Sequence, residues 1–266
     1  MTTLGEIRGW VLDMDGTIFL GDTLLPGAKA FLSLLAERGL PTLLMTNNSS
    51  KRPAQYAEKL ARLGLNVPEA MIFTSGEATA LTLKAQQPGA RVYLVGTPAL
   101  EEEFESHGFT LTGDAPDVAV LGFDTTLTYD KLWKLCDFVR GGLPYIATHP
   151  DVNCPLPGGF MPDIGATIAF VEASTERLPD QIVGKPNPPV VEAVARRTGL
   201  PVESLAMVGD RLYTDIALGA AGMTTVLVLT GETQPEDIPG TPHQPDYVMR
   251  DLQALHDALR ASSETG

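Results

Sequence analysis

The sequence predicts an α/β protein with a doubly wound parallel sheet, and two patterns along the chain carry this prediction. Short apolar runs alternate with stretches of helical periodicity over most of the 266 residues, which is typical of repeated β-α units. Most of the runs place Val, Ile or Leu at consecutive positions, so that both faces of the strand would be apolar. Strands of this kind lie in parallel sheets that are covered by helices on both sides.

The expected elements follow in order from the N-terminus. An apolar run over residues 9–13 predicts the first strand, and "GAKAFLSLLAERG" predicts a helix that stops at Gly39. The run "PTLLMTNN" predicts the next strand, and "SSKRPAQYAEKLARLG" predicts a helix with Pro53 in its first turn and Gly64 at its end. Further strands are expected at the runs "RVYLVG", "DVAVLGF", "PYIAT", "SLAMVGD" and "TTVLVLTG".

Polar residues follow three of the expected strands. The first strand ends in Asp13-x-Asp15, the second in Thr46-Asn47, and a late one is followed by Asp210. Folds of this class bind ligands at the carboxyl ends of their strands, so these residues are expected to converge on one crevice. Because two neighbouring carboxylates repel each other, the D-x-D pair indicates chemistry that needs both groups.

The charge balance and the scarcity of cysteine exclude several classes of function. The formal net charge is −14, so binding to nucleic acid or another polyanion is not expected. The two cysteines form no CxxC pair and the four histidines form no HxH or HxxxH pair, so neither a disulfide framework nor a zinc site is expected. The N-terminus lacks a signal-peptide core and no apolar run reaches about 18 residues, so we expect a cytoplasmic protein without a membrane partner.

Four motifs together resemble the signature of the haloacid dehalogenase (HAD) superfamily of phosphatases. They are "LDMDGTI" around Asp13, "TNNSSK" from Thr46, "GKPNP" around Lys185 and "GDRLYTDI" from Gly209. These strings are most similar to those of the NagD-type group, which includes 4-nitrophenylphosphatases and phosphoglycolate phosphatases.

The resemblance implies a Rossmann-like HAD core with an α/β cap domain inserted between the second and third motifs. The interval between those motifs holds its own alternation of apolar runs and helical patterns. We therefore expect a phosphatase core of residues 1–76 and 182–266, with an inserted cap domain of residues 77–181.

The resemblance gives Asp13 and Asp15 different roles in the hydrolysis of a phosphate ester. Asp13 would attack phosphorus and form an aspartyl-phosphate. Since a carboxylate and a phosphate dianion repel each other, a cation must neutralise both, and Mg²⁺ suits a site of oxygen ligands. The implied ligands are Asp13, Asp210 and the main-chain carbonyl of Asp15. The side chain of Asp15 would protonate the leaving alkoxide and later take a proton from the attacking water.

The remaining motif residues are expected around the transferred phosphoryl group. Thr46 and the main-chain amide of Asn47 would bind its oxygens, and Lys185 would supply a fixed positive charge. Two interpretations stay open for Asp215. It would support the metal, in part through water, or it would cap the helix that is expected to begin near Thr214.

The leading interpretation is a Mg²⁺-dependent phosphomonoesterase for small metabolites such as sugar phosphates, nucleoside monophosphates, phosphoglycolate or aryl phosphates. Dehalogenation, another HAD activity, would need neither Asp15 nor Asp210. Phosphonate cleavage would need a Schiff-base lysine in the cap, where Lys84, Lys131 and Lys134 have no special context. A receiver-like phosphoaspartate switch is the third alternative, but a receiver is a single domain of ordinary size and needs no D-x-D pair.

Further expectations concern the cap. The Pro- and Gly-rich segment 148–165 is expected to be a long irregular loop. By the resemblance it would help to select the leaving group, with His149 and Asp151 among the candidate residues. Cys136 and Trp133 are expected to pack in the core. The resemblance also implies a homodimer through the cap.

Overall fold

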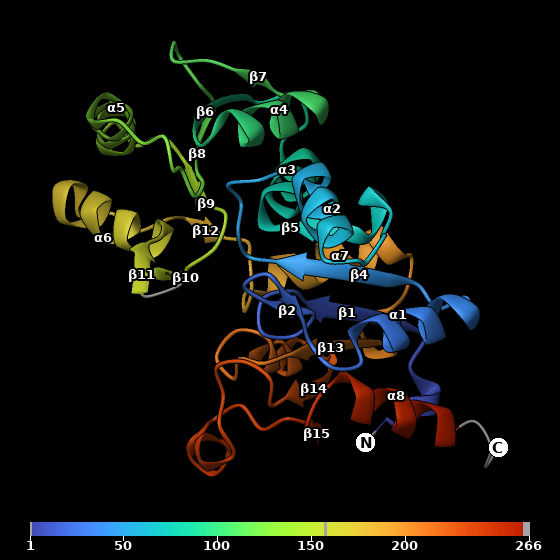
Figure 1. Ribbon diagram of the computed structural model, residues 1–266. Helices are drawn as coiled ribbons and strands as arrows, with labels where there is room; N and C mark the ends of the chain where they lie inside the picture. The colour runs from blue at the N-terminus through green and yellow to red at the C-terminus, as the bar shows by residue number, and fades with distance from the viewer. Residues whose placement is uncertain (1, 157–158, 263–266) are drawn as a thin grey trace. The chain divides into compact units, whose positions relative to one another are not determined.

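The computed structural model describes residues 2–156 and 159–262 (Figure 1). The chain divides into two compact units. Unit 1 comprises Met1–Thr46, Ala57–Phe73 and Val194–Gly266, and unit 2 comprises Asn47–Tyr56 and Thr74–Ala193. The two units are defined by compactness and differ in their ranges from the expected core and cap. They do not test the expected domain boundaries, which stay a prediction.

Unit 1 is built on a parallel sheet with the strand order β15–β14–β13–β1–β4–β5. The strands are β1 (Gly9–Asp13), β4 (Thr42–Thr46), β5 (Ile72–Thr74), β13 (Leu205–Gly209), β14 (Thr224–Val228) and β15 (Tyr247–Met249). Strand β1 pairs in parallel with β13 on one side and with β4 on the other. Every residue of β13 and β14 is buried, as the consecutive apolar residues in these strands predicted. The predicted α/β fold with a doubly wound parallel sheet is confirmed.

Helices cover this sheet because each presents an apolar stripe to it. Helices α1 (Ala28–Glu37) and α8 (Leu252–Ala261) lie side by side (Figure 1). On α1 the buried stripe includes Phe31, whose ring packs edge-on against Trp10 of β1 at 5.2 Å between centroids. Shorter elements complete the unit: η1 (Leu4–Glu6), the hairpin β2 (Phe19–Leu20) and β3 (Thr23–Leu24), η2 (Glu69–Met71), η3 (Val202–Ser204), η4 (Ile216–Ala221) and η5 (Pro235–Gly240). Helices α2 (Pro53–Arg62) and α7 (Pro188–Thr198) each contribute residues to both units.

Unit 2 contains a second parallel sheet, with the strand order β12–β9–β8–β6–β7. Its strands are β6 (Arg91–Val95), β7 (Thr110–Leu111), β8 (Val118–Leu121), β9 (Tyr145–Ala147) and β12 (Gln181–Ile182). Helices α3 (Ser75–Gln86) and α4 (Pro98–Ser106) pack together, as do α5 (Tyr129–Arg140) and α6 (Ile164–Thr175) (Figure 1). The buried side chains of α5 and α6 form one apolar cluster with those of β6, β8 and β9.

The segment expected to be an irregular loop contains a β-hairpin. Strands β10 (Asn153–Leu156) and β11 (Gly159–Pro162) pair antiparallel. Pro155 and Pro162 obscure the strand pattern in the sequence, but both strands of a two-stranded ribbon are edges, where proline is tolerated. The expectation of an irregular loop was therefore wrong for the strands of this hairpin.

Two core predictions on α5 had different outcomes. Cys136 is buried with Leu135 and Val139, as expected. Trp133 is 59% exposed and shares an outer face with Tyr129, one turn earlier, so its assignment to the core was wrong. The periodicity marks α5 as amphipathic, but it left the placement of this large aromatic side chain ambiguous. In the described residues, no helix has both the length and the apolarity needed to cross a membrane.

Candidate active-site groups

Unit 1 brings three aspartates together at the carboxyl ends of neighbouring strands. Asp13 is the last residue of β1, Asp210 directly follows β13, and Asp215 lies five residues further along. One carboxylate oxygen from each lies within 4.8 Å of the others. Asp13 is half-buried, whereas Asp210 is 2% exposed and Asp215 is fully buried. Removing three such carboxylates from water is unfavourable unless positive charge or hydrogen bonds compensate.

Two glycines allow the carboxylates to approach the main chain. A Cβ atom on Gly209 would collide with the carboxyl group of Asp215, and one on Gly16 would collide with that of Asp210. Gly16 also has a φ of +87°, in a tight turn where its N–H donates to the Phe19 carbonyl at 2.8 Å. Glycine at these positions is thus required by close packing, and at Gly16 also by the backbone conformation.

Asp210 is held by the loop that follows β14. The N–H of Glu232 donates to Asp210 Oδ2 at 2.7 Å, and the N–H of Thr233 donates to the Asp210 carbonyl at 3.2 Å. A Cβ atom on Gly231 would overlap the Asp210 carboxylate, so the loop lies directly against it. The hydroxyl of Thr230 donates to the Gly16 carbonyl at 2.6 Å, which joins the loop to the turn after β1. None of these four loop residues was predicted from the sequence as part of a site.

Arg211 places one positive charge near the carboxylates. Burial disfavours its charged form, but the nearby acidic groups, Asp13 first and then Tyr213, Asp210 and Glu232, raise the pKa of Arg211 above its usual value. Its Nε lies 3.0 Å from Glu232 Oε2, and its main-chain N–H donates to Asp215 Oδ2 at 3.1 Å. Arg211 was not predicted as a site residue, and its place inside "GDRLYTDI" is the one signal for it in the sequence.

The acidic group in unit 1 has the donor set that a hard divalent cation prefers. It offers carboxylate oxygens from three aspartates, and Arg211 places one positive charge nearby. The residues present therefore fit a metal ion. Asp215 belongs to this group, and its side chain makes no hydrogen bond that caps η4, so the capping interpretation was wrong.

The two other site residues predicted in unit 1 have different surroundings. Thr46 is the last residue of β4, next to β1, and is buried. Asp15 is exposed and is not one of the three clustered aspartates of the described chain. Its exposure gives the Asp15 carboxylate contact with solvent, which a group that exchanges protons with water requires.

Unit 2 brings Asn47 and Lys185 together through the Asn47 side chain. The Asn47 Oδ1 accepts a hydrogen bond from the Lys185 N–H at 2.9 Å, and Nδ2 donates to the Lys185 carbonyl at 3.0 Å. The same Nδ2 donates to Asp151 Oδ1 at 3.1 Å. Lys185 is 3% exposed, which is unusual for a lysine and separates it from an ordinary surface charge.

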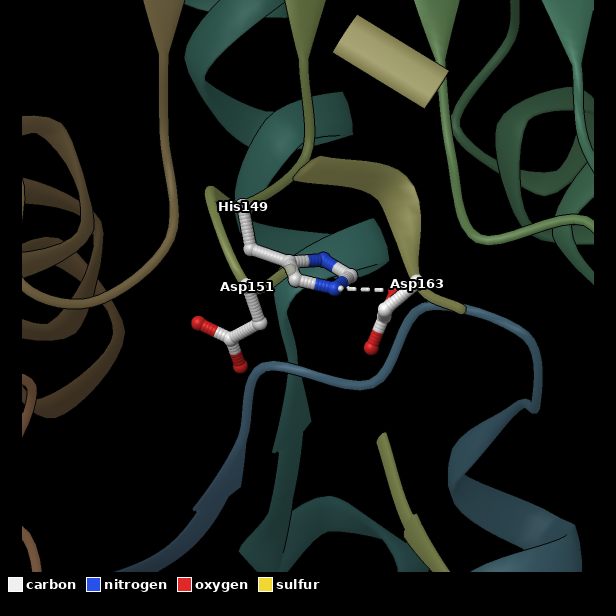
Figure 2. A group of neighbouring side chains, drawn as sticks. All are labelled: His149, Asp151 and Asp163. Atoms are coloured by element: carbon white, nitrogen blue, oxygen red, sulfur yellow. Dashed lines mark hydrogen bonds and ion pairs between the residues drawn. The ribbon is translucent and has the colours of Figure 1, made fainter. Parts of the chain in front are cut away.

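Asp151, which accepts from Asn47, also belongs to a second group of titratable side chains with His149 and Asp163, drawn in Figure 2. His149 is fully buried, and its Nε2 lies 3.0 Å from Asp163 Oδ1. Asp163 also accepts a hydrogen bond from the Ile164 N–H and thereby caps α6. His149 was one of several candidates in segment 148–165 for contact with the leaving group; its burial does not favour that role, and the contact by this segment stays a prediction.

Comparison with known proteins agrees with this fold. The family model described as haloacid dehalogenase-like hydrolase matches residues 10–110, and a second one, described as HAD-hydrolase-like, matches residues 182–255. The parallel sheet with carboxylates at its strand ends is thus that of a HAD-like hydrolase.

Individual relatives narrow the assignment. The acid sugar phosphatase of Staphylococcus aureus (strain MRSA252) is 37% identical over 93% of this chain and 96% of its own length. Among solved structures, 4-nitrophenylphosphatase from Thermotoga maritima has a TM-score of 0.93 at 47% identity, covering 97% of this chain and 100% of that one. NagD from E. coli K-12 has a TM-score of 0.87 at 35% identity, covering 93% and 97%. The chain belongs to the NagD-type phosphatases of the HAD superfamily.

Proposed function

We propose that this protein is a Mg²⁺-dependent phosphomonoesterase that hydrolyses small phosphorylated metabolites through an aspartyl-phosphate on Asp13. The observation that carries the proposal is the group of Asp13, Asp210 and Asp215, in which one carboxylate oxygen from each residue lies within 4.8 Å of the others. Such a group combines a nucleophile with oxygen ligands for a cation, and the family assignment supports phosphate ester hydrolysis as its use.

In the proposed reaction Asp13 and Asp15 act in sequence. A carboxylate oxygen of Asp13 forms a bond to phosphorus while the bond to the ester oxygen breaks. Asp15 gives its proton to the departing alkoxide. Asp15 then takes a proton from a water molecule, which attacks phosphorus and releases inorganic phosphate and the free Asp13 carboxylate.

The metal would be held by Asp13, Asp210 and the main-chain carbonyl of Asp15, with Asp215 close enough to contact it directly or through water. When bound, Mg²⁺ would neutralise charge on the nucleophile and on the phosphoryl oxygens. The Glu232 N–H and the Gly16 turn hold the Asp210 carboxylate in place, so the chain itself provides the orientation of this ligand.

Thr46, Asn47 and Lys185 would serve the transferred phosphoryl group. In this proposal the Thr46 hydroxyl and the Asn47 main-chain N–H donate to phosphoryl oxygens, and the Lys185 ammonium balances their charge. The Asn47 side chain has a different role, because its amide group is hydrogen-bonded to the main chain of Lys185 and to Asp151.

The substrates we propose are sugar phosphates, nucleoside monophosphates, phosphoglycolate-like acids and aryl phosphates. The names acid sugar phosphatase and 4-nitrophenylphosphatase among the relatives support this range. No nucleic acid or membrane partner is proposed, and a cytoplasmic location and a homodimer through the inserted domain stay proposals. Sedimentation velocity of the full chain tests the homodimer, and a monomer at all concentrations would contradict it.

A kinetic screen tests the proposed activity. We expect Mg²⁺-dependent turnover of 4-nitrophenyl phosphate and a ranking of metabolites by kcat/KM, the quantity that reports transition-state discrimination. Asp13→Asn should abolish turnover, while Asp22→Asn, an exposed change in the same unit, should not. A single burst that leaves a stable phosphoprotein in the wild-type chain would contradict the proposal and favour a phosphoaspartate switch.

A further inference from the structure

We propose that Asp151 is a positioning residue for Lys185, and that it acts through the side chain of Asn47. The buried pair of His149 and Asp163 fixes the loop that carries Asp151. The proposal rests on the proposed function in one respect, since it takes Lys185 to serve the phosphoryl group.

The Asn47 carboxamide makes a paired contact with the main chain of Lys185. It accepts from the Lys185 N–H at 2.9 Å and donates to the Lys185 carbonyl at 3.0 Å. The main chain of Asn47 is itself held, because the Ser75 hydroxyl donates to its carbonyl. Asn47 therefore couples the main chain after β4 to the main chain that carries the Lys185 ammonium.

Asp151 determines which way the Asn47 amide faces. An asparagine amide has two orientations of similar shape, and the wrong one would set its Oδ1 against the Lys185 carbonyl. An ionised carboxylate accepts hydrogen bonds and cannot donate them. Since Asp151 Oδ1 lies 3.1 Å from Asn47 Nδ2, the flipped amide would also place oxygen against a carboxylate. Asp151 thus favours the orientation that binds both main-chain groups of Lys185.

The main chain at Asp151 is held closely by the first turn of α6. The Gly165 N–H donates to the Asp151 carbonyl at 2.7 Å, and the Asp163 N–H donates to the Val152 carbonyl at 2.9 Å. A Cβ atom on Gly165 would lie 2.5 Å from the Pro150 carbonyl oxygen, so only glycine fits at this position without a shift.

A second glycine lets the Lys185 segment approach the same loop. The Gly184 N–H donates to the Thr148 carbonyl at 2.8 Å. A Cβ atom on Gly184 would lie 2.8 Å from Asn47 Oδ1 and 2.7 Å from the Cβ of His149. The close contact of these three segments is therefore a property of the sequence at Gly165 and Gly184.

The buried hydrogen bond between His149 and Asp163 holds the segment that carries Asp151. Because the Asp163 carboxylate is an acceptor, the His149 Nε2 carries the proton of their 3.0 Å hydrogen bond (Figure 2). The other ring nitrogen, Nδ1, lies 3.1 Å from Thr148 Oγ1 and 3.3 Å from Ser75 Oγ. With the ring proton on Nε2, Nδ1 accepts from the Thr148 hydroxyl. The Ser75 hydroxyl gives its proton to the Asn47 carbonyl and lies against the ring without a hydrogen bond to it.

Amide exchange at Lys185 tests this positioning without any need for activity. The chain has seven lysines, so ¹⁵N-lysine labelling gives few signals, and Lys185→Arg identifies the one of interest. In Asp151→Ala we expect exchange of the Lys185 N–H to become about tenfold faster, the scale of one lost hydrogen bond. Asp151→Asn can keep the acceptor and should restore slow exchange. The control Asp114→Asn, exposed in the same unit, should leave exchange unchanged.

Kinetics with 4-nitrophenyl phosphate show whether the positioning matters for the reaction. A displaced ammonium loses charge stabilisation in the transition state, so kcat should fall about tenfold in Asp151→Ala while KM changes less than about twofold. Unchanged Lys185 exchange, equal acceleration at all lysines, or an unchanged kcat in Asp151→Ala would each overturn the proposal. If the wild-type chain has no phosphatase activity, the proposed function fails, and the exchange measurement alone decides whether Asp151 orders Lys185.

Two changes at Asp163 distinguish its hydrogen bond to His149 from its capping of α6. Asp163→Ser keeps a good cap for α6 but cannot reach His149, whereas Asp163→Asn can keep both contacts. We expect faster Lys185 exchange in the serine variant and near wild-type exchange in the asparagine variant. Equal exchange in these two variants would remove His149 and Asp163 from the proposal.

Discussion

The Asp210 carboxylate accepts a hydrogen bond from the main-chain N–H of Glu232, with 2.7 Å between nitrogen and Oδ2. This contact joins the loop after β14 to the aspartate that follows β13, across 22 residues of sequence. Because the donor is a main-chain group, it fixes one oxygen of Asp210 whatever side chain stands at position 232. The loop therefore orients a proposed metal ligand through its backbone.

Gly231→Ala should displace Asp210. The added Cβ would overlap the carboxylate, so either the loop or the aspartate must move. We expect the Mg²⁺ concentration for half-maximal activity to rise at least about tenfold, as for other supports of a metal ligand. Gly240→Ala is the matched control, because no described atom lies within 4 Å of its new Cβ. Equal metal dependence in the two variants would show that the loop does not orient Asp210.

Asp15→Asn should permit formation of the aspartyl-phosphate but slow its hydrolysis. The 4-nitrophenolate leaves without a proton, so Asp13 can still form the aspartyl-phosphate, but no carboxylate remains to activate water. We expect a burst of about one product per chain and then turnover slowed at least about a hundredfold. Rapid-quench kinetics measure the burst, and mass spectrometry locates phosphate on Asp13. Turnover equal to that of the wild-type chain would refute the role of Asp15.

The strand ends were predictable because their signals are local. Consecutive apolar residues define β1, β4 and β13, and polar residues follow them directly in the sequence. In a parallel sheet the carboxyl ends of adjacent strands share an edge, which was enough to group Asp13 with Asp210.

The supports of these residues were not predictable, since they are contacts between distant segments. The loop residues Gly231 and Glu232 belong to no periodic pattern. A main-chain donor cannot be predicted from the residue type, because every residue except proline has a main-chain N–H. The pair of His149 and Asp163 is joined across a hairpin whose prolines hid its strands. The Asn47 side chain was likewise unassigned, because its task depends on the position of Lys185, 138 residues away.

Removal of metal should abolish activity without unfolding the chain. We expect no turnover in excess chelator, recovery with Mg²⁺, and poor replacement by Ca²⁺, whose looser coordination suits in-line attack less well. Binding to the native state should also raise the melting temperature, by an amount that grows with ion concentration. Asp210→Asn should lose both the activity and this thermal shift. Full activity in chelator would contradict the proposed metal dependence.

Tyr145→Phe should stabilise the protein, or leave its stability unchanged, near neutral pH. The Tyr145 side chain is fully buried, and its hydroxyl has no hydrogen-bond partner among the described residues. Removing an unsatisfied buried hydroxyl is expected to raise the free energy of unfolding by up to about 1 kcal/mol. Tyr93→Phe is the matched comparison, since the Tyr93 hydroxyl donates to the Lys131 carbonyl at 3.0 Å and its loss should destabilise. Urea unfolding of both variants measures the difference, and equal destabilisation would contradict this reading of Tyr145.

The same two tyrosines should make the fold sensitive to alkali. Burial raises the pKa of Tyr145 and raises that of Tyr93 to about 12. Above the unfolded tyrosine pKa of about 10 the unfolded chain releases protons that the folded chain retains, so the free energy of unfolding falls as pH rises. Over the range from about pH 10 to 12 this loss should be smaller in Tyr145→Phe than in the wild-type chain. Urea unfolding at several pH values in this range measures the slope, and an identical slope in the variant would show that Tyr145 does not contribute.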